Sequence, residues 1–112
     1  MVTIDYAIVQ DDTARRSWSV RVLGYIILVT DQAGTELLAY HWHPAGGNRV
    51  DWPHLHVADP ALNPASILAK AHLPTAQISL QDVIRLTITE FGVPPRRPDW
   101  EAVLLRTRQG VE

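Results

Sequence analysis

Two long hydrophobic segments separated by a short turn place the strongest constraint on the fold. Residues 17–30 are rich in β-branched and aromatic residues, which predicts a long strand, kinked or bulged near Gly24. Residues 31–34 are typical of a turn, and residues 35–43 predict a second strand. Because the connection is so short, the two strands are expected to form an antiparallel hairpin.

One further strand is predicted before this hairpin in the sequence and one after it. Residues 3–9 show the two-residue period of a strand with one buried face. The side chains predicted to lie on that face are Ile4, Tyr6 and Ile8. Residues 50–57 are predicted to be extended, and Pro53 suggests an edge strand or a bulge because proline has no amide hydrogen to donate. The sequence therefore predicts a sheet of about four strands.

The second half of the chain changes to the periodicity of helices. Ser79 followed three residues later by Asp82 is typical of a helix N-terminus, and Gly92 before two prolines indicates the end of that helix. Its apolar residues fall on one helical face, namely Leu80, Val83, Ile84, Ile88 and Phe91. Asp99 is predicted to cap a final helix, whereas residues 63–73 fit either a helix or a short strand.

Strands followed by helices indicate an α+β fold. We expect a single domain over residues 1–112, with an antiparallel sheet of about four strands and two or three helices packed on one face. A chain of 112 residues is long enough to bury a hydrophobic core without cross-links. Zero cysteines exclude a disulfide scaffold, a thiolate zinc site and a cysteine nucleophile.

Charge and hydropathy limit the partners. The formal net charge of −2 gives no bulk attraction to nucleic acid, although a local basic patch can still bind RNA. No signal peptide or membrane-spanning stretch is apparent, so a cytoplasmic protein without a membrane partner is expected. The oligomeric state does not follow from the sequence.

Four of the five histidines lie within one short segment, in two pairs spaced two residues apart. His41 and His43 form one pair, and His54 and His56 form the other. Residues i and i+2 of a strand point to the same face. If the two strands are antiparallel neighbours, the residue numbers of any two cross-strand partners add up to the same sum. Any register in which this sum is odd places both histidine pairs on one face. A sum of 97 would set His43 opposite His54 and His41 opposite His56.

Three interpretations of this histidine patch stay open. It could hold a divalent metal, since imidazole is a common metal ligand, in an enzyme acting on a small molecule. It could instead perform metal-free acid–base cleavage of a ribose phosphate, with Arg49 and the amides of Gly46 and Gly47 holding the phosphate. In the third, the histidines are structural in a non-enzymatic binding module. His72 could reach the patch, but a lone histidine before a turn is more often structural.

The run Tyr40-His41-Trp42-His43, followed after a short loop by Pro53-His54-Leu55-His56, resembles the TumE-like toxins of bacterial type II toxin–antitoxin systems. The resemblance covers residues 37–57. It implies a cytoplasmic toxin neutralised by a cognate antitoxin protein, and the chemistry of such small toxins is often RNA cleavage. The functional residues that it implies are His41, His43, His54 and His56. Our leading expectation is therefore a ribonuclease toxin, with Arg49 contacting the anion.

Overall fold

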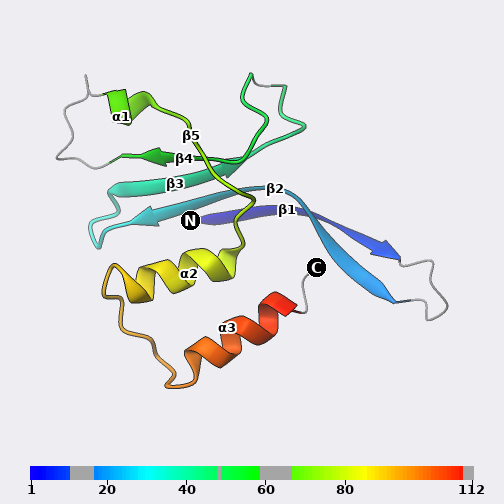
Figure 1. Ribbon diagram of the computed structural model, residues 1–112, viewed down its shortest axis with the longest axis vertical. Helices are drawn as coiled ribbons and strands as arrows, with labels where there is room; N and C mark the ends of the chain where they lie inside the picture. The colour runs from blue at the N-terminus through cyan, green and yellow to red at the C-terminus, as the bar shows by residue number, and fades with distance from the viewer. Residues whose placement is uncertain (11–16, 48, 59–66, 110–112) are drawn as a thin grey trace. The chain divides into compact units, whose positions relative to one another are not determined.

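The computed structural model describes residues 1–10, 17–47, 49–58 and 67–109. Within these residues, five strands form one sheet in which neighbours follow chain order (Figure 1). The strands are β1 (Val2–Gln10), β2 (Trp18–Thr30), β3 (Glu36–Trp42), β4 (His54–Val57) and β5 (Leu73–Pro74). The helices are α1 (Ile67–Lys70), α2 (Leu80–Thr89) and α3 (Trp100–Gln109). The antiparallel sheet and the helices confirm the α+β class, with five strands instead of about four.

The chain groups into two compact units. The first comprises Met1–Tyr6 and Val22–Gln77, and it contains β3, β4, β5, α1 and all of the histidines. The second comprises Ala7–Arg21 and Ile78–Glu112, and it contains α2 and α3. The single domain over residues 1–112 stays a prediction.

The predicted hairpin between β2 and β3 is confirmed. The two strands pair antiparallel, and the turn between them is closed by one side chain. Asp31 Oδ1 accepts hydrogen bonds from the backbone N–H of Ala33 and of Thr35, each at 2.9 Å. Gly34 follows with φ +84°, in the left-handed region that glycine adopts without strain. Local turn residues therefore determine how these two strands meet.

The pairing of β2 with β3 is irregular at the turn end of β2, where the register shifts between Val29 and Thr30. The paired residues begin at Tyr25, so the kink or bulge near Gly24 stays a prediction. Gly24 is buried, and a Cβ at this position would lie 2.7 Å from the backbone oxygen of Trp42. The glycine is therefore needed for the close approach of the neighbouring chain, a role that a strand glycine has as often as a kink.

The core of the first unit lies in the centre of the sheet. Tyr25 and Ile27 of β2 are each 2% exposed, and Ala39 of β3 is 1% exposed. Strand alternation puts the two β2 residues on the same face as Tyr40 and Trp42, their cross-strand neighbours. The rings of Tyr25 and Trp42 lie 5.8 Å apart. This aromatic and aliphatic face is opposite to the face that carries His41.

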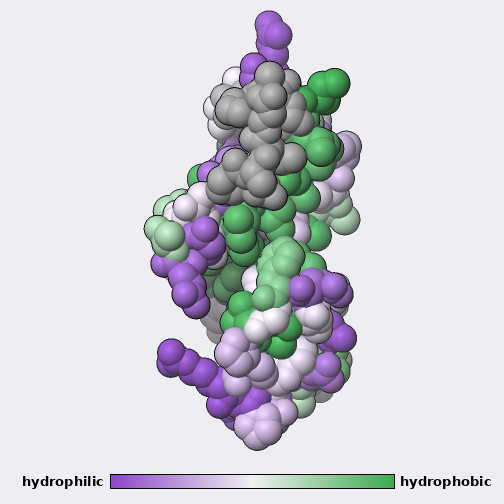
Figure 2. Space-filling model, turned by 90° about the vertical axis from the view of Figure 1, so that its left-hand side faces the viewer, coloured by the Kyte–Doolittle hydropathy of each residue, from purple (hydrophilic) through white to green (hydrophobic). Residues whose placement is uncertain are grey.

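The predicted burial of β1 is wrong at two positions. Tyr6 is 60% exposed and Ile8 is 62% exposed, whereas Ala7 and Val9 are less exposed. Because β1 is an edge strand, its side chains have neighbours on one side only, and beyond Ile4 the less exposed side chains belong to the opposite face, that of Ala7 and Val9. Figure 2 shows hydrophobic side chains at the surface beside hydrophilic ones on the face turned to the viewer.

The extended segment predicted for residues 50–57 forms a strand only from His54 onward. Pro53 precedes this strand, and its carbonyl accepts a hydrogen bond from the backbone N–H of Thr75 at 3.1 Å. β4 lies between β3 and β5, so the expectation of an edge strand or a bulge at Pro53 is wrong. The ambiguous segment contains both α1 and the start of β5, and residues 63–66 lie outside the described part.

Helix α2 has the predicted N-terminus. Ser79 Oγ accepts a hydrogen bond from the N–H of Asp82 at 3.1 Å, and the Asp82 carboxylate accepts one from the N–H of Ser79 at 3.3 Å. Gly92, at φ +71°, follows the helix as predicted. Of the predicted apolar face, Val83 is buried, whereas Phe91 is 49% exposed because it lies beyond the last helical residue.

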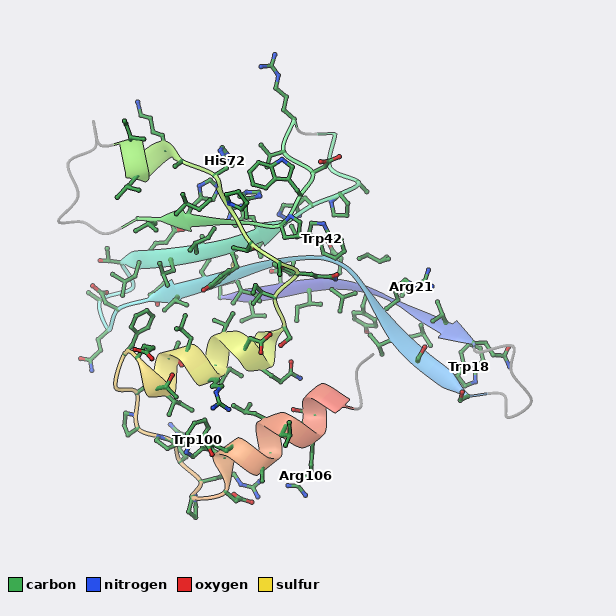
Figure 3. All side chains as sticks on the ribbon, in the orientation of Figure 1. Trp18, Arg21, Trp42, His72, Trp100 and Arg106 are labelled. Atoms are coloured by element: carbon green, nitrogen blue, oxygen red, sulfur yellow. The ribbon has the colours of Figure 1, made fainter. Side chains whose placement is uncertain are left out.

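Helices α2 and α3 contact each other within the second unit. Side chains from both helices and from the loop between them line a small apolar cavity: Ile84, Ile88, Pro95, Arg96, Arg97, Trp100, Val103 and Leu104. Trp100 stands at the start of α3 (Figure 3). Asp99 precedes α3, and its backbone oxygen accepts from the N–H of Val103, while its carboxylate accepts two hydrogen bonds from the guanidinium of Arg97.

Replacing Ser79 by alanine is expected to lower the free energy of unfolding by about 1 kcal/mol, because the N–H of Asp82 loses its acceptor. The midpoint of thermal unfolding should fall by about 4 °C, measured by circular dichroism. Ser19→Ala is the control, since Ser19 is an exposed residue of β2. Equal melting temperatures for the two variants would contradict the capping role.

Candidate metal centre

Strand pairing places His41, His54 and His56 on one face of the sheet, as predicted. The register differs from the expected one by two residues, since His41 lies opposite His54 and Ala39 lies opposite His56. β3 ends at Trp42, so His43 lies beyond the paired part of the strand. The expected register required His43 to pair with His54, and the early end of β3 prevents this pairing.

Three of these histidines come together closely enough to share one ion. The ring centroids of His41 and His54 are 5.5 Å apart, those of His41 and His56 are 4.9 Å apart, and those of His54 and His56 are 5.0 Å apart. One ligand nitrogen from each ring lies within 4.8 Å of the other two. A single point therefore lies within about 2.8 Å of all three nitrogens, and small side-chain rotations would reach metal–nitrogen distances of about 2.0–2.1 Å.

His54 is oriented by its own backbone neighbourhood. Its side chain is 4% exposed, and its Nδ1 lies 2.9 Å from the backbone carbonyl of Trp52. A carbonyl can only accept, so Nδ1 carries the hydrogen and Nε2 keeps a free lone pair. The indole of Trp52 also lies against this imidazole, with centroids 5.4 Å apart. Metal-binding histidines are held in this way, with the second nitrogen donating to a carbonyl or carboxylate.

Burial and mutual repulsion keep the other two imidazoles neutral. The pKa of His41 is lowered from 6.5 to about 4, first by burial and then by the neighbouring histidines. The pKa of His56 is lowered by burial and by His72 and His54, against the opposing effects of Glu36 and of a hydrogen bond to the backbone of Ala71. A neutral imidazole offers a lone pair, which is the form that binds a metal.

The structure adds His72 to the cluster. Its ring lies 4.6 Å from that of His56 and 4.9 Å from that of His54 (Figure 3). The pairing of His54 with Pro74 and of Leu55 with Leu73 sets this position, because the same register continued by one residue puts His72 opposite His56. In an extended segment, His72 and Pro74 point to the same face, and this spacing was the available signal. It could not be used because the sequence of residues 63–73 fits either a helix or a strand.

The remaining predicted site residues lie at the margin or apart. Among the described rings, His43 contacts only that of His41, with centroids 5.9 Å apart. Arg49 is exposed and makes no hydrogen bond or ion pair with any other described residue. The N–H of Gly46 donates to the carbonyl of His43 at 3.2 Å, so this amide is engaged in a turn. The phosphate contacts predicted for Arg49 and for the amide of Gly47 stay predictions.

Comparisons with models of known protein families, with curated proteins and with solved structures found no match. The resemblance to TumE-like toxins therefore stays a prediction. None of the helices in the described part of the chain has the length and hydrophobicity needed to span a membrane.

In the metal-free protein, the lowered pKa of His41 makes stability depend on pH. The unfolded chain takes up a proton near pH 6.5, whereas the folded protein leaves this imidazole neutral down to about pH 4. The contribution of His41 to the free energy of unfolding is therefore fully present above pH 6.5 and is lost as the pH falls toward 4. After discounting for solvent screening, we expect a loss on the order of 1 kcal/mol.

Thermal unfolding in buffer with a chelator measures this effect, with an expected fall in melting temperature of about 4 °C between about pH 7 and about pH 4.5. The His41→Ala variant should show a smaller fall, because the group that titrates differently in the two states is gone. An identical pH profile for both proteins would show that His41 does not carry the effect.

Proposed function

We propose that this protein is a metal-dependent enzyme that acts on a small molecule through a divalent transition metal held by His41, His54 and His56. The observation that carries the proposal is the convergence of three imidazole nitrogens within 4.8 Å of one another. Imidazole nitrogens suit zinc, copper, iron and nickel, whereas calcium and magnesium prefer oxygen ligands.

The electrostatics favour metal binding over metal-free acid–base catalysis. A general acid must hold a proton near neutral pH, and the pKa of His41, about 4, leaves it neutral there. The pKa of His56 is shifted in the same direction. The lowered pKa values therefore disfavour His41 and His56 as general acids and favour them as metal ligands.

The electrostatics of the histidine cluster also favour metal binding over a structural role for the histidines. Neighbouring imidazoles repel one another as they take up protons, which is one cause of the lowered pKa of His41. Placing the three imidazoles so close together does not stabilise the metal-free protein, whereas a bound cation interacts favourably with the lone pair of each imidazole.

The ligand set determines what chemistry a metal would supply. Three neutral imidazoles leave the full charge on a divalent ion, which favours binding of a hydroxide or an anionic substrate. When bound by His41, His54 and His56, a metal would supply Lewis-acid chemistry, acidifying water or polarising a carbonyl or phosphoryl oxygen. The part played by the protein is positioning: the carbonyl of Trp52 fixes His54, and the sheet fixes the spacing of His41 and His56.

Titration of the metal-free protein with Zn²⁺, Ni²⁺, Co²⁺ and Cu²⁺, followed by isothermal calorimetry and elemental analysis, tests the proposal. One metal ion per chain is expected. His41→Ala should weaken binding by at least about 10–100-fold, since even residues that only orient a ligand have effects of this size. His43→Ala is the matched control, because it removes an imidazole beside the centre but outside the triad. Absence of stoichiometric binding, or equal affinity of the two variants, would refute the proposal.

A second candidate function is the toxin. Support comes from the two motif segments, which lie on adjacent paired strands with their histidines on one face. The expected partners are then a cognate antitoxin and RNA. Expression of the wild type, His41→Ala and His54→Ala in a bacterial host tests it through growth. A harmless wild type without any antitoxin, or undiminished toxicity of both variants, would contradict it.

A further inference from the structure

We infer that His72 is a fourth protein ligand of the proposed centre, so that the metal is held by four imidazoles from β3, β4 and the residue that precedes β5. The inference rests on the proposed function, which concerns three of these ligands. The carrying observation is that the ring centroid of His72 lies as close to those of His54 and His56 as the ring centroid of His41 does, while the nitrogens of His72 stay outside the 4.8 Å group in the present rotamer. His41 is 5.5 and 4.9 Å from His54 and His56, and His72 is 4.9 and 4.6 Å from them.

The four rings form two triangles with a common edge. His54 and His56 of β4 form that edge, with a centroid distance of 5.0 Å. His41 lies on the side of β3, opposite His54 in the strand pairing. His72 lies on the side of β5, opposite His56 when the register of β4 and β5 is continued. An ion above the common edge would therefore have one imidazole on each flank and two beneath it.

The backbone around His72 is fixed while its side chain keeps freedom to turn. Before β5, the N–H of Ala71 donates to the carbonyl of Leu68 at 3.4 Å. After β5, the N–H of Thr75 donates to the carbonyl of Pro53 at 3.1 Å. The side chain of His72 is exposed, so it can rotate toward an ion without displacing packed neighbours. These contacts hold the fourth donor beside the centre and leave its rotamer adjustable.

A fourth imidazole changes which metals leave room for a substrate. Zinc sites are almost always tetrahedral, so four protein ligands would enclose Zn²⁺ completely, as in structural sites. Cu²⁺ and Ni²⁺ accept tetragonal arrangements, in which four nitrogens leave further positions open. The four-histidine set therefore favours Cu²⁺ or Ni²⁺ as the metal that combines firm binding with an open position for water or substrate.

Electron paramagnetic resonance of the Cu²⁺-loaded full chain counts the nitrogens bound to the ion. We expect four imidazole nitrogens in the wild type and three in His72→Ala, together with a Cu²⁺ affinity at least about 10-fold lower. Because His72 is exposed, the variant should fold, and circular dichroism verifies this. His43→Ala is the matched control and should keep four nitrogens, since its ring contacts only that of His41 among the described rings.

The outcomes separate this inference from the proposed function. If the wild type binds Cu²⁺ through three nitrogens, or if His72→Ala keeps the nitrogen count and affinity of the wild type, the fourth ligand is refuted and the three-histidine centre stands. If the wild type binds none of the metals tested, both fail. Loss of one nitrogen in His43→Ala but not in His72→Ala would assign the fourth position to His43 and overturn the inference.

Discussion

Replacing Ile27 by alanine is expected to lower the free energy of unfolding by about 2–5 kcal/mol, the largest effect expected of a single substitution in this sheet. Ile27 is 2% exposed and lies in β2, between the neighbouring strands β1 and β3. Truncation removes buried methyl and methylene groups and leaves a cavity, because strands hydrogen-bonded on both sides cannot collapse into the space. Equilibrium denaturation with urea measures the loss.

A matched control for this substitution exists in the same unit. Ile67 of α1 is 86% exposed, so Ile67→Ala removes the same atoms without opening a cavity. We expect a change within about 0.5 kcal/mol. A loss below about 1 kcal/mol for Ile27→Ala, or equal losses for both variants, would show that the centre of the sheet is not the core of this unit.

Saturation with a bound metal is expected to raise the melting temperature of the wild type by about 10 °C at neutral pH. A ligand that binds only the folded state adds about 2.7 kcal/mol when its concentration is 100 times Kd, and each kcal/mol shifts a domain of this size by about 4 °C. The ion links strands β3 and β4 through His41, His54 and His56, which unfolding separates. Differential scanning calorimetry with and without metal measures the shift.

Variants of the same cluster provide the comparison for this shift. His41→Ala should lose most of the metal-induced stabilisation, whereas His43→Ala should retain it, because only the first of these residues belongs to the triad. A chelator should return the wild type to the metal-free melting temperature. A metal-induced rise of equal size in both variants would mean that the ion binds elsewhere.

The parts of the structure that could be predicted from sequence are those with local causes. The turn at Asp31 and the capping of α2 by Ser79 depend on hydrogen bonds between residues within four positions of each other. The shared face of the histidine pairs depends only on strand parity, which survives an error in register. For this reason the face was predicted correctly, although the expected pairing was shifted by two residues.

The parts that sequence could not determine depend on where elements end and what lies beside them. The register of β4 depends on its start after Pro53, and the exposure of Tyr6 depends on the position of β1 at the sheet edge. His72 joined the cluster through a two-residue strand, which is too short to show a hydrophobic period. Arg49 lies in the loop between the two motif segments, and it makes no hydrogen bond or ion pair with a described histidine.

Strands β3, β4 and β5 follow one another both along the chain and across the sheet. All four histidines of the inferred centre therefore lie within one stretch of the sequence, residues 41–72. Synthesis proceeds from the N-terminus, so the ribosome completes all four ligands before it reaches α2 and α3. An ion present during synthesis therefore meets the full ligand set before the C-terminal helices exist.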